Sequence, residues 1–332
     1  MPISALQFSF AAVALFASFG LGAGEAPKKT VVIDIEKADA DFAVQGEYTG
    51  DVAIPGKDKF KAGMQVIARG NGKFHAEFLT GGLPGDGWDK AKKTPLDGET
   101  KDGVTVLKGA LGSAEIKDGK MTLACEHGGA PSELKRVVRE SPTLGAKPPE
   151  GALVIFDGTN LDQFQKGAKM AEDKTLEQGA NTLKPLQNYT LHLEFKLAYM
   201  PEASGQGRSN SGCYAQSRYE VQILDSFGLK GENNECGGIY TIKAPDVNMC
   251  FPPLSWQTYD IDYTAAKFED GKKVKNATMT VKHNGVLIHE NAECTHATTS
   301  SPMKEGPEPA PIHLQNHGCP VHFRNIWVVE KP

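Results

Sequence analysis

Short runs of alternating apolar and polar residues follow one another along most of the chain, separated by glycine, proline and asparagine. In the run 218–224, Tyr219, Val221 and Ile223 alternate with polar residues, which places Arg218, Glu220 and Gln222 together on the polar face of a predicted strand. A period of two residues is typical of a β-strand with one buried face. Helical periodicity is nearly absent. The pattern therefore predicts an all-β protein with short antiparallel strands.

Three dipeptides mark tight turns between such runs: Asn71-Gly72, Asp118-Gly119 and Asn284-Gly285. Asn-Gly and Asp-Gly favour the left-handed backbone of two-residue β-hairpins. Each dipeptide therefore predicts that the runs on either side of it are antiparallel neighbours.

The 332-residue chain is longer than one typical domain, so we expect two. Residues 27–140 predict a small β-rich auxiliary domain, either a barrel or a sandwich. Residues 141–151 (SPTLGAKPPEG) have the composition of a semi-rigid linker. Longer strand patterns fill residues 152–332, and without helical partners they fit two antiparallel sheets packed as a jelly-roll β-sandwich.

An apolar run, Phe8–Leu21, is followed by the small residues Gly22, Ala23, Gly24 and Ala26. This arrangement predicts a signal peptide over residues 1–26 and a periplasmic or extracellular protein. The alternative is a membrane anchor, but a spanning helix needs about 20 apolar residues, and this run is shorter. We expect no membrane segment in the mature chain.

The net charge of -5 is spread without a basic stripe, which argues against nucleic acid and anionic membranes as partners. An oxidising destination permits disulfides among the six cysteines, although their connectivity does not follow from spacing. Cys236 and Cys250 flank a loop rich in glycine, proline and asparagine, so they are the candidate pair.

The stretch RSNSGCYAQSRYEVQILDSFG, residues 208–228, organises the second domain. Its polar strand face carries Glu220, and we interpret this face as one wall of a sugar-sized cleft. The expected substrate-binding residues in this stretch are Asn210, Tyr214, Gln216, Arg218, Gln222 and Asp225. The alternative for Glu220 is an ordinary surface pair with an arginine, which stabilises a protein little.

Several motifs in order resemble the 3-keto-disaccharide hydrolase domain family, which is frequent in exported bacterial proteins of planctomycete and Bacteroidetes type. They include FDGTNLDQF, the stretch 208–228, CGGIYTIKAPDVNMC, WQTYDI, VKHNGVLIHE and IHLQNHGCPVHFRNIWV, within residues 153–329. The resemblance implies a concanavalin-like jelly roll and action on 3-keto glycosides. A carbohydrate is then the expected partner. The family's catalytic residues are not carried over, so the residue roles rest on strand faces.

A ketone at C3 of a sugar acidifies the proton on C2, whose removal lets the C1 substituent leave before water adds back. This route requires a base near C2, a donor at the C3 oxygen and an acid at the glycosidic oxygen. Glu220 is the expected base. His317, which shares a strand face with Gln315, is the second acid/base candidate because histidine titrates near neutral pH. Arg324 offers a rigid fork of donors for the enolate oxygen.

Each of these roles has an alternative. His317 can be a hydrogen-bonded surface residue, and Arg324 can belong to a salt bridge. Lys243 and Asp246, on a loop, are expected to reach over the cleft and bind substrate, unless the loop only carries a disulfide. A divalent cation held by Asp225, Glu220 and His317 is conceivable, but no ligand spacing supports it, so the metal stays unknown.

Two other functions compete with a hydrolase or lyase acting on 3-keto glycosides. One is a non-catalytic, lectin-like carbohydrate-binding module, because this kind of sandwich hosts both functions. The other is a structural module of a surface assembly, which predicts an exposed apolar patch. The charged residues Glu220, Arg218 and Arg324 favour catalysis.

Overall fold

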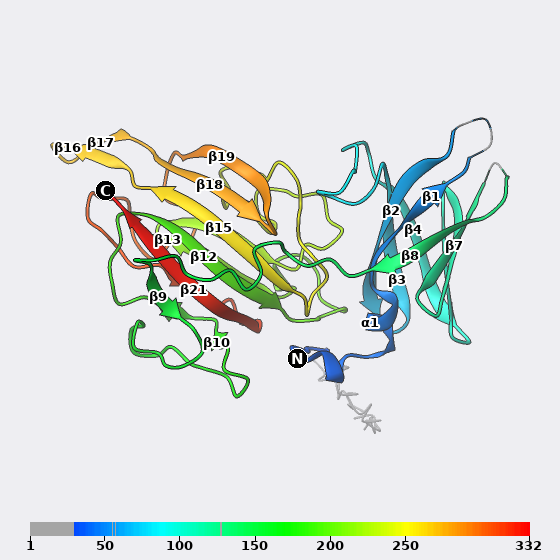
Figure 1. Ribbon diagram of the computed structural model, residues 1–332, viewed down its shortest axis with the longest axis horizontal. Coiled ribbons are helices and arrows are strands. Elements are labelled where there is room, and N and C mark those ends of the chain that lie inside the picture. The colour runs from blue at the N-terminus through cyan, green and yellow to red at the C-terminus, as the bar shows by residue number, and fades with distance from the viewer. Residues whose placement is uncertain (1–29, 55, 57, 127) are drawn as a thin grey trace, which may run out of the picture.

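A computed structural model describes residues 30–54, 56, 58–126 and 128–332. The predicted signal peptide, residues 1–26, lies outside these ranges. The described chain is almost entirely β-structure, arranged as a barrel followed by a sandwich (Figure 1). None of its helices combines the length and the apolar composition that crossing a bilayer requires. The all-β fold class is confirmed.

The first unit is a closed antiparallel barrel of eight strands, in which each strand pairs with the next and β8 returns to β1. The short helices η1 (Ile35–Lys37) and α1 (Ala40–Val44) precede it. Its strands are β1 (Gly46–Val52), β2 (Phe60–Gly70), β3 (Lys73–Thr80), β4 (Thr94–Lys101), β5 (Val104–Gly109), β6 (Gly112–Lys117), β7 (Lys120–Cys125) and β8 (Ser132–Val137). The small β-rich unit is thus a barrel and not a sandwich.

Alternate residues of these strands fill the barrel interior, as the period of two predicts. The interior cluster includes Tyr48, Met64, Phe74, Leu107, Leu123 and Leu134. The predicted tight turns are confirmed. Both residues of Asn71-Gly72, of Asp118-Gly119 and of Asn284-Gly285 have positive φ, and each pair joins two antiparallel strands.

The second unit packs a seven-stranded sheet on a four-stranded sheet. The larger sheet contains β9 (Leu153–Phe156), β10 (Leu176–Glu177), β12 (Asn188–Leu197), β15 (Trp256–Thr264), β18 (Ala277–His283), β19 (Val286–Cys294) and β21 (Val321–Lys331). The smaller sheet contains β11 (Ala180–Asn181), β13 (Asn210–Ala215), β14 (Tyr219–Leu224) and β20 (His313–Leu314). A short helix, η2 (Gly205–Gly207), precedes β13, and a separate hairpin joins β16 (Lys267–Glu269) to β17 (Lys272–Lys275).

The two sheets share one apolar core. Side chains from β12 and β15 meet those of the smaller sheet, among them Leu193, Phe195, Ile261, Val221 and Ile223. Tyrosine hydroxyls add hydrogen bonds across the core: Tyr259 donates to Gln222 O at 2.6 Å, and Tyr263 donates to Gln216 Oε1 at 2.8 Å. The smaller sheet is therefore fixed on one face by the core, and its other face is left to form a site.

The first part of the predicted linker packs on the outer face of the larger sheet. Thr143 Oγ1 donates to Asp260 Oδ2 at 2.8 Å, and Gly145 N donates to Glu194 Oε1 at 2.5 Å. Ala146 O accepts hydrogen bonds from Asn325 and Trp327. Residues 141–146 thus form an arm that covers polar side chains of the sheet.

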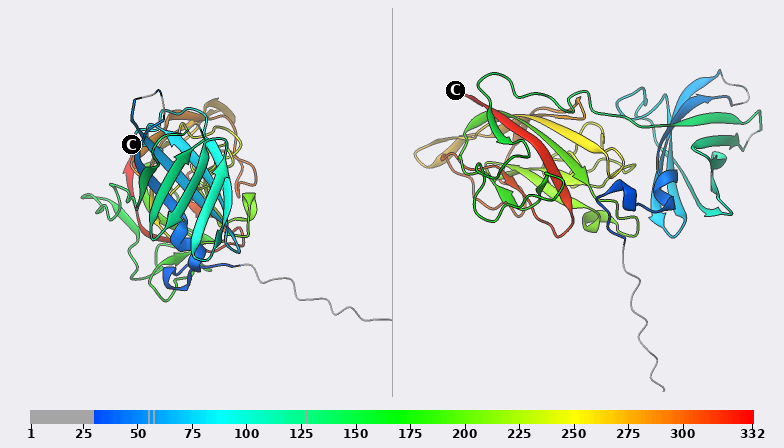
Figure 2. Two further views of the ribbon diagram at one scale, coloured as in Figure 1. Left: turned by 90° about the vertical axis from the view of Figure 1, so that its right-hand side faces the viewer. Right: turned by 60° about the horizontal axis from the view of Figure 1, so that its bottom comes forward.

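The contacts between the barrel and the sandwich include those of β2 and of the loop that follows β3. Lys93 Nζ donates to Gly228 O at 3.0 Å and to Leu229 O at 2.8 Å. Ile67 of β2 belongs to the core cluster of the sandwich. Figure 2 shows the barrel in front of the sandwich in its left view and beside it in its right view.

The six cysteines are free thiols. Cys236 and Cys250 are nonetheless neighbours, because their thiols form a hydrogen bond in the sandwich core. The sequence therefore predicted this proximity, but the expected disulfide is not formed in this structure, where both thiols are free.

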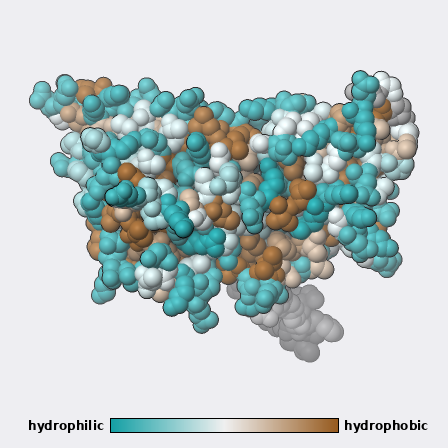
Figure 3. Space-filling model, viewed as in Figure 1, coloured by the Kyte–Doolittle hydropathy of each residue, from teal (hydrophilic) through white to brown (hydrophobic). Residues whose placement is uncertain are grey.

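Apolar residues on the face shown in Figure 3 form several separate patches among hydrophilic ones. The large apolar residues that are exposed in the described chain come from many different elements: Val31, Ile35, Val106, Val138, Val154, Leu183, Val274, Leu287 and Met303. This distribution lends no support to the surface-assembly alternative, which predicted a single apolar patch.

Candidate active site

The hairpin of β13 and β14 places the polar residues of both strands on one face. Gly212 pairs with Gln222, and Tyr214 pairs with Glu220. Paired residues of antiparallel strands point to the same side, so these four share the face that looks away from the core. The opposite face is buried in the core, as predicted from Val221 and its alternating neighbours.

The short strand β20 brings a third segment alongside. Its Leu314 pairs with Cys213, and Gln315 N donates to Gly212 O at 2.9 Å. This pairing puts Gln315 and the exposed His317 next to the Glu220 face, although about 100 residues separate them in the sequence. The predicted meeting of Glu220, Gln315 and His317 is thus observed.

A small cavity of about 60 Å³ lies on this face. Six of its lining residues are ones that the sequence predicted: Asn210, Tyr214, Glu220, Gln222, Gln315 and His317. Four were missed: Gln206, Tyr240, Thr299 and Ser300. The missed residues lie in η2 and in loops, where no strand period signals the direction of a side chain. This volume is below the roughly 300–1,000 Å³ of typical small-molecule sites, so a larger ligand would extend beyond the cavity.

Glu220 has the most unusual electrostatics in the cavity. Its side chain is buried, with 2% of the residue exposed, and this burial raises its pKa to about 8. A hydrogen bond from Tyr214 opposes the shift only in part. A carboxyl group whose pKa lies near neutral pH is suited to accept and return a proton.

A chain of hydrogen bonds positions the Glu220 carboxylate. Gln315 Nε2 donates to the hydroxyl of Tyr214 at 3.1 Å, and that hydroxyl is hydrogen-bonded to Glu220. Burial, together with the adjacent Glu220, raises the pKa of Tyr214. Tyr214 therefore stays protonated and acts as a donor to the carboxylate.

Gly212 makes room for this carboxylate. A Cβ at position 212 would lie 2.0 Å from Glu220 Oε1, which is far inside van der Waals contact. Only glycine leaves the backbone of β13 close enough for the Glu220 side chain to lie across it.

Amide groups occupy the far end of the cavity. Asn210 Nδ2 donates to Gln206 O and Oε1, and Gln222 Nε2 donates to Gln206 Oε1 at 3.1 Å. Asn210 Oδ1 is buried without a partner in the protein. Buried polar atoms normally have partners, so this oxygen is an acceptor available to a ligand hydroxyl.

Arg324 lies elsewhere, which corrects the expectation that it shares a pocket with Glu220 and His317. It belongs to β21 of the larger sheet, where its Nε donates to Glu194 Oε2 at 2.6 Å. Its guanidinium also stacks 4.0 Å from the ring centroid of Trp256. Arg324 therefore belongs to a salt bridge, which was the alternative interpretation of this residue, and we do not include Arg324 in the candidate active site.

Replacing Arg324 by Met is expected to lower stability without affecting catalysis. Burial alone would raise the pKa of Glu194, but hydrogen bonds that include those from His192 and Arg324 hold it at about 2. Removing one donor from this buried carboxylate costs roughly 1–3 kcal/mol at pH 7. This ion-pair stability is lost as the pH falls from about 4.5 toward 2. Thermal unfolding of the Arg324→Met variant at pH 7 measures the expected loss of stability. A large fall in turnover would contradict the structural assignment.

The other predicted binding residues also lie outside the cavity. Arg218 follows the end of β13 in the three-residue turn of the hairpin and binds backbone oxygens of Lys304 and Glu308. Gln216 occupies the same turn and accepts from Arg218 at 3.0 Å. These two residues therefore hold the hairpin and the loop around it instead of contacting a substrate.

Asp225, Lys243 and Asp246 have different partners from those expected. Asp225 Oδ2 accepts from Arg208 Nε at 2.6 Å inside the protein, and Lys243 forms an ion pair with Asp246 at 3.7 Å. None of the three lines the Glu220 cavity. Within the described ranges, no group of three or more His, Cys, Asp and Glu side chains is arranged to hold a metal ion. The described residues therefore do not form the divalent-cation site considered for Asp225, Glu220 and His317.

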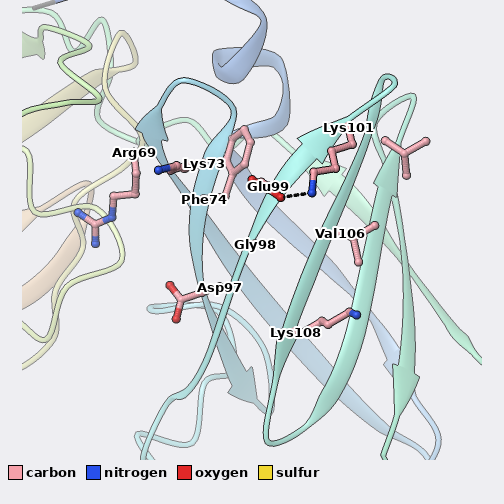
Figure 4. Close-up of a pocket in the computed structure, with 10 residues that line it drawn as sticks. Arg69, Lys73, Phe74, Asp97, Gly98, Glu99, Lys101, Val106 and Lys108 are labelled. Atoms are coloured by element: carbon pink, nitrogen blue, oxygen red, sulfur yellow. Dashed lines mark ion pairs between the residues drawn. The ribbon is translucent and has the colours of Figure 1, made fainter.

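Another cavity, of about 800 Å³, is an open groove on the outer wall of the barrel. Figure 4 shows its lining, with Glu99 turned toward Lys101, with which it forms an ion pair. This pairing lowers the pKa of Glu99 and keeps the group ionised. The groove lacks the buried carboxyl with a raised pKa that distinguishes the smaller cavity, so we place the candidate active site at Glu220.

Comparisons with known proteins agree with the fold. Residues 151–329 match the 3-keto-alpha-glucoside-1,2-lyase-like domain. A "putative glycosyl hydrolase" from Parabacteroides distasonis ATCC 8503 aligns with 31% identity and a TM-score of 0.51, covering 55% of this chain and 85% of its own. Another protein of that description and organism aligns with 18% identity and a TM-score of 0.41, covering 59% and 99%. Among curated proteins there was no match.

The domain match spans more than half of the chain and contains both sheets of the sandwich, including the hairpin that carries Glu220. The first of the two solved structures supports it, since over 30% of aligned residues are identical. The chain therefore belongs to the 3-keto-alpha-glucoside-1,2-lyase-like domain family.

Proposed function

We propose that this protein is a carbohydrate-active enzyme that cleaves the glycosidic bond of 3-keto glycosides, with Glu220 as the base. One observation carries the proposal: a buried carboxyl group whose pKa is raised to about 8 lies in a cavity lined by amides and hydroxyls. The family and the glycosyl hydrolase description of a related structure support a sugar as substrate.

The reaction has three steps. The Glu220 carboxylate takes the proton from C2, and the electron pair of that C–H bond forms an enolate with the C3 ketone. The enolate then expels the C1 oxygen, which leaves as an alcohol after it gains a proton, and a C1–C2 double bond remains. Glu220 releases to solvent the proton that it took from C2, which replaces the proton given to the leaving oxygen, and water adds its hydroxide to C1 and its proton to C2. A lyase would release the unsaturated sugar before the last step.

The remaining cavity residues supply the other requirements. Gln315 uses one amide N–H on Tyr214, so its second N–H is available to the C3 oxygen, the role first expected of Arg324. His317 is exposed at the mouth, where it can donate a proton to the leaving oxygen. The free acceptor of Asn210 suits a sugar hydroxyl.

The direct test is release of nitrophenol from a p-nitrophenyl 3-keto-glucoside by purified protein, with and without a chelator. We expect release in both mixtures and none from the matching glucoside without the ketone, since its C2 proton is not acidic. Tight binding of the 3-keto compound without release would instead favour the lectin-like alternative. Loss of release on chelation would show that a metal is required.

With the p-nitrophenyl 3-keto-glucoside, whose nitrophenolate leaves without a proton from His317, activity is expected to rise with pH toward a plateau above about 8. The raised pKa of Glu220 means that the group is largely protonated at pH 7, and only its ionised form accepts the C2 proton. Below the pKa, kcat/KM should therefore increase about tenfold per pH unit. A profile of kcat/KM from pH 5.5 to 9.5, corrected for the rate without protein, measures this. A plateau that already begins near pH 5.5 would contradict the assignment of Glu220.

A further inference from the structure

A second cavity, of about 550 Å³, lies at the junction of the barrel and the sandwich. It shares no lining residue with the Glu220 cavity. The barrel contributes Glu77 of β3 and the loop 88–93, and the sandwich contributes residues 228–230 and 245–247. Its volume falls in the range of small-molecule sites, roughly 300–1,000 Å³.

Two side chains that line this cavity have polar atoms without partners in the protein. Trp88 Nε1 is buried and has no acceptor. Glu77 contacts His75 Nε2 through Oε1 at 3.2 Å, while its Oε2 has no donor. Because buried polar atoms are nearly always hydrogen-bonded, an unpaired donor and an unpaired acceptor at one cavity indicate a ligand that offers both. Sugar hydroxyls are such groups, and the indole of Trp88 adds a flat apolar surface for a ring.

Lys93 joins these groups to the sandwich. Its ammonium lies 5.4 Å from the ring centroid of Trp88 and donates to Gly228 O and Leu229 O. An ammonium group has three donors, so one N–H of Lys93 is left for a ligand. The cavity is thus formed only when the barrel and the sandwich are together.

The charge around the cavity is opposite in sign to that of the whole chain. Its lining contains four lysines, Lys90, Lys92, Lys93 and Lys230, against two acidic residues, Glu77 and Asp246. The chain as a whole carries -5. Lys230 pairs with Glu232, whereas Lys90 and Lys92 are exposed at the rim. A local positive excess attracts an anionic ligand.

We propose that this cavity binds an acidic oligosaccharide, with a sugar ring against Trp88 and a carboxylate near Lys90, Lys92 and Lys93. The site is separate from Glu220 and does not depend on the proposed reaction. In the intact protein it would hold a charged stretch of glycan at the barrel.

Calorimetric titration with trigalacturonate tests the proposal, with neutral cellotriose and with acetate as comparisons. We expect trigalacturonate to bind at low ionic strength, and to bind at least about tenfold more tightly than either comparison. Added salt should weaken this binding. Equal affinity for cellotriose would overturn the acidic assignment, and equal affinity for acetate would overturn the sugar assignment.

Charge reversal at the rim locates the site. The double change Lys90→Glu and Lys92→Glu should weaken trigalacturonate binding about tenfold or more. Both positions are exposed, so folding is not at risk. Lys272→Glu with Lys275→Glu on the distant hairpin β16–β17 makes the same change of charge and is the matched control. Equal weakening by both double variants, or no binding of trigalacturonate to the native protein, would overturn the proposal. Trp88→Phe should also weaken binding, and unchanged affinity would remove Trp88 from the site.

Discussion

Replacing Glu220 by Gln is expected to reduce kcat for a 3-keto glucoside by about 1,000-fold, since a positioned general base contributes roughly 100- to 10,000-fold. Glutamine keeps the shape of the side chain and can still accept the hydrogen bond of Tyr214, but it cannot take a proton from C2. Binding should remain nearly intact, because the amides and hydroxyls of the cavity are unchanged. Aglycone release and calorimetric binding measured on the same variant separate the two effects.

Glu290→Gln provides the matched control, because Glu290 is an exposed glutamate on β19 that does not line the cavity. Its turnover should equal that of the native protein. Native turnover in the Glu220 variant would remove Glu220 from the mechanism. A parallel loss of binding and turnover would assign it to substrate binding alone.

Replacing Gly212 by Ala is expected to have the second largest effect. The added Cβ would lie 2.0 Å from Glu220 Oε1, so the carboxylate or the strand has to move. A displacement of about 1 Å at a reacting group can cost about 100-fold in rate. Overpacking of this kind also destabilises a protein, typically by about 1–3 kcal/mol. We therefore expect kcat/KM to fall about 100-fold and the Tm to fall with it.

Gly207→Ala is the control for this change. Gly207 lies in η2, close in sequence, and a Cβ there meets nothing within 4 Å. Native activity is expected for this variant. Should Gly212→Ala also retain native activity, the close approach of Glu220 to the β13 backbone would have no role in catalysis.

The alternation of apolar and polar residues and the Asn-Gly and Asp-Gly turn dipeptides were enough to predict the fold class. Both signals arise from residues that are close along the chain, such as those of the left-handed turn at Asn284-Gly285. The sequence left both a barrel and a sandwich open for the first unit, because the pairing of β8 with β1 that closes the barrel joins residues that are far apart in sequence. Packing of the 141–146 arm was also missed. Its proline and glycine content indicates a linker, and its partners, such as Glu194, lie on another element.

The residues of the candidate site could be predicted where the alternation along a strand determines which face a side chain occupies. Glu220 and Gln222 follow from alternation along one strand, and His317 from alternation after Leu314. Arg324 was misplaced because alternation gives the face of a strand but not the sheet to which the strand belongs.

Loops were a separate source of error. Arg218 was assigned to a strand, but the hairpin turns through it. Tyr240 was missed because it reaches the cavity from an irregular loop, where side-chain direction has no period.

The central claim is that Glu220 removes the C2 proton of an oxidised sugar. Cleavage of a 3-keto glucoside in deuterium oxide, followed by NMR of the released sugar, tests it most directly. We expect deuterium at C2 of the product, at a level well above that in mixtures without protein or with the Glu220→Gln variant. Release of a product that retains its original C2 hydrogen would contradict it.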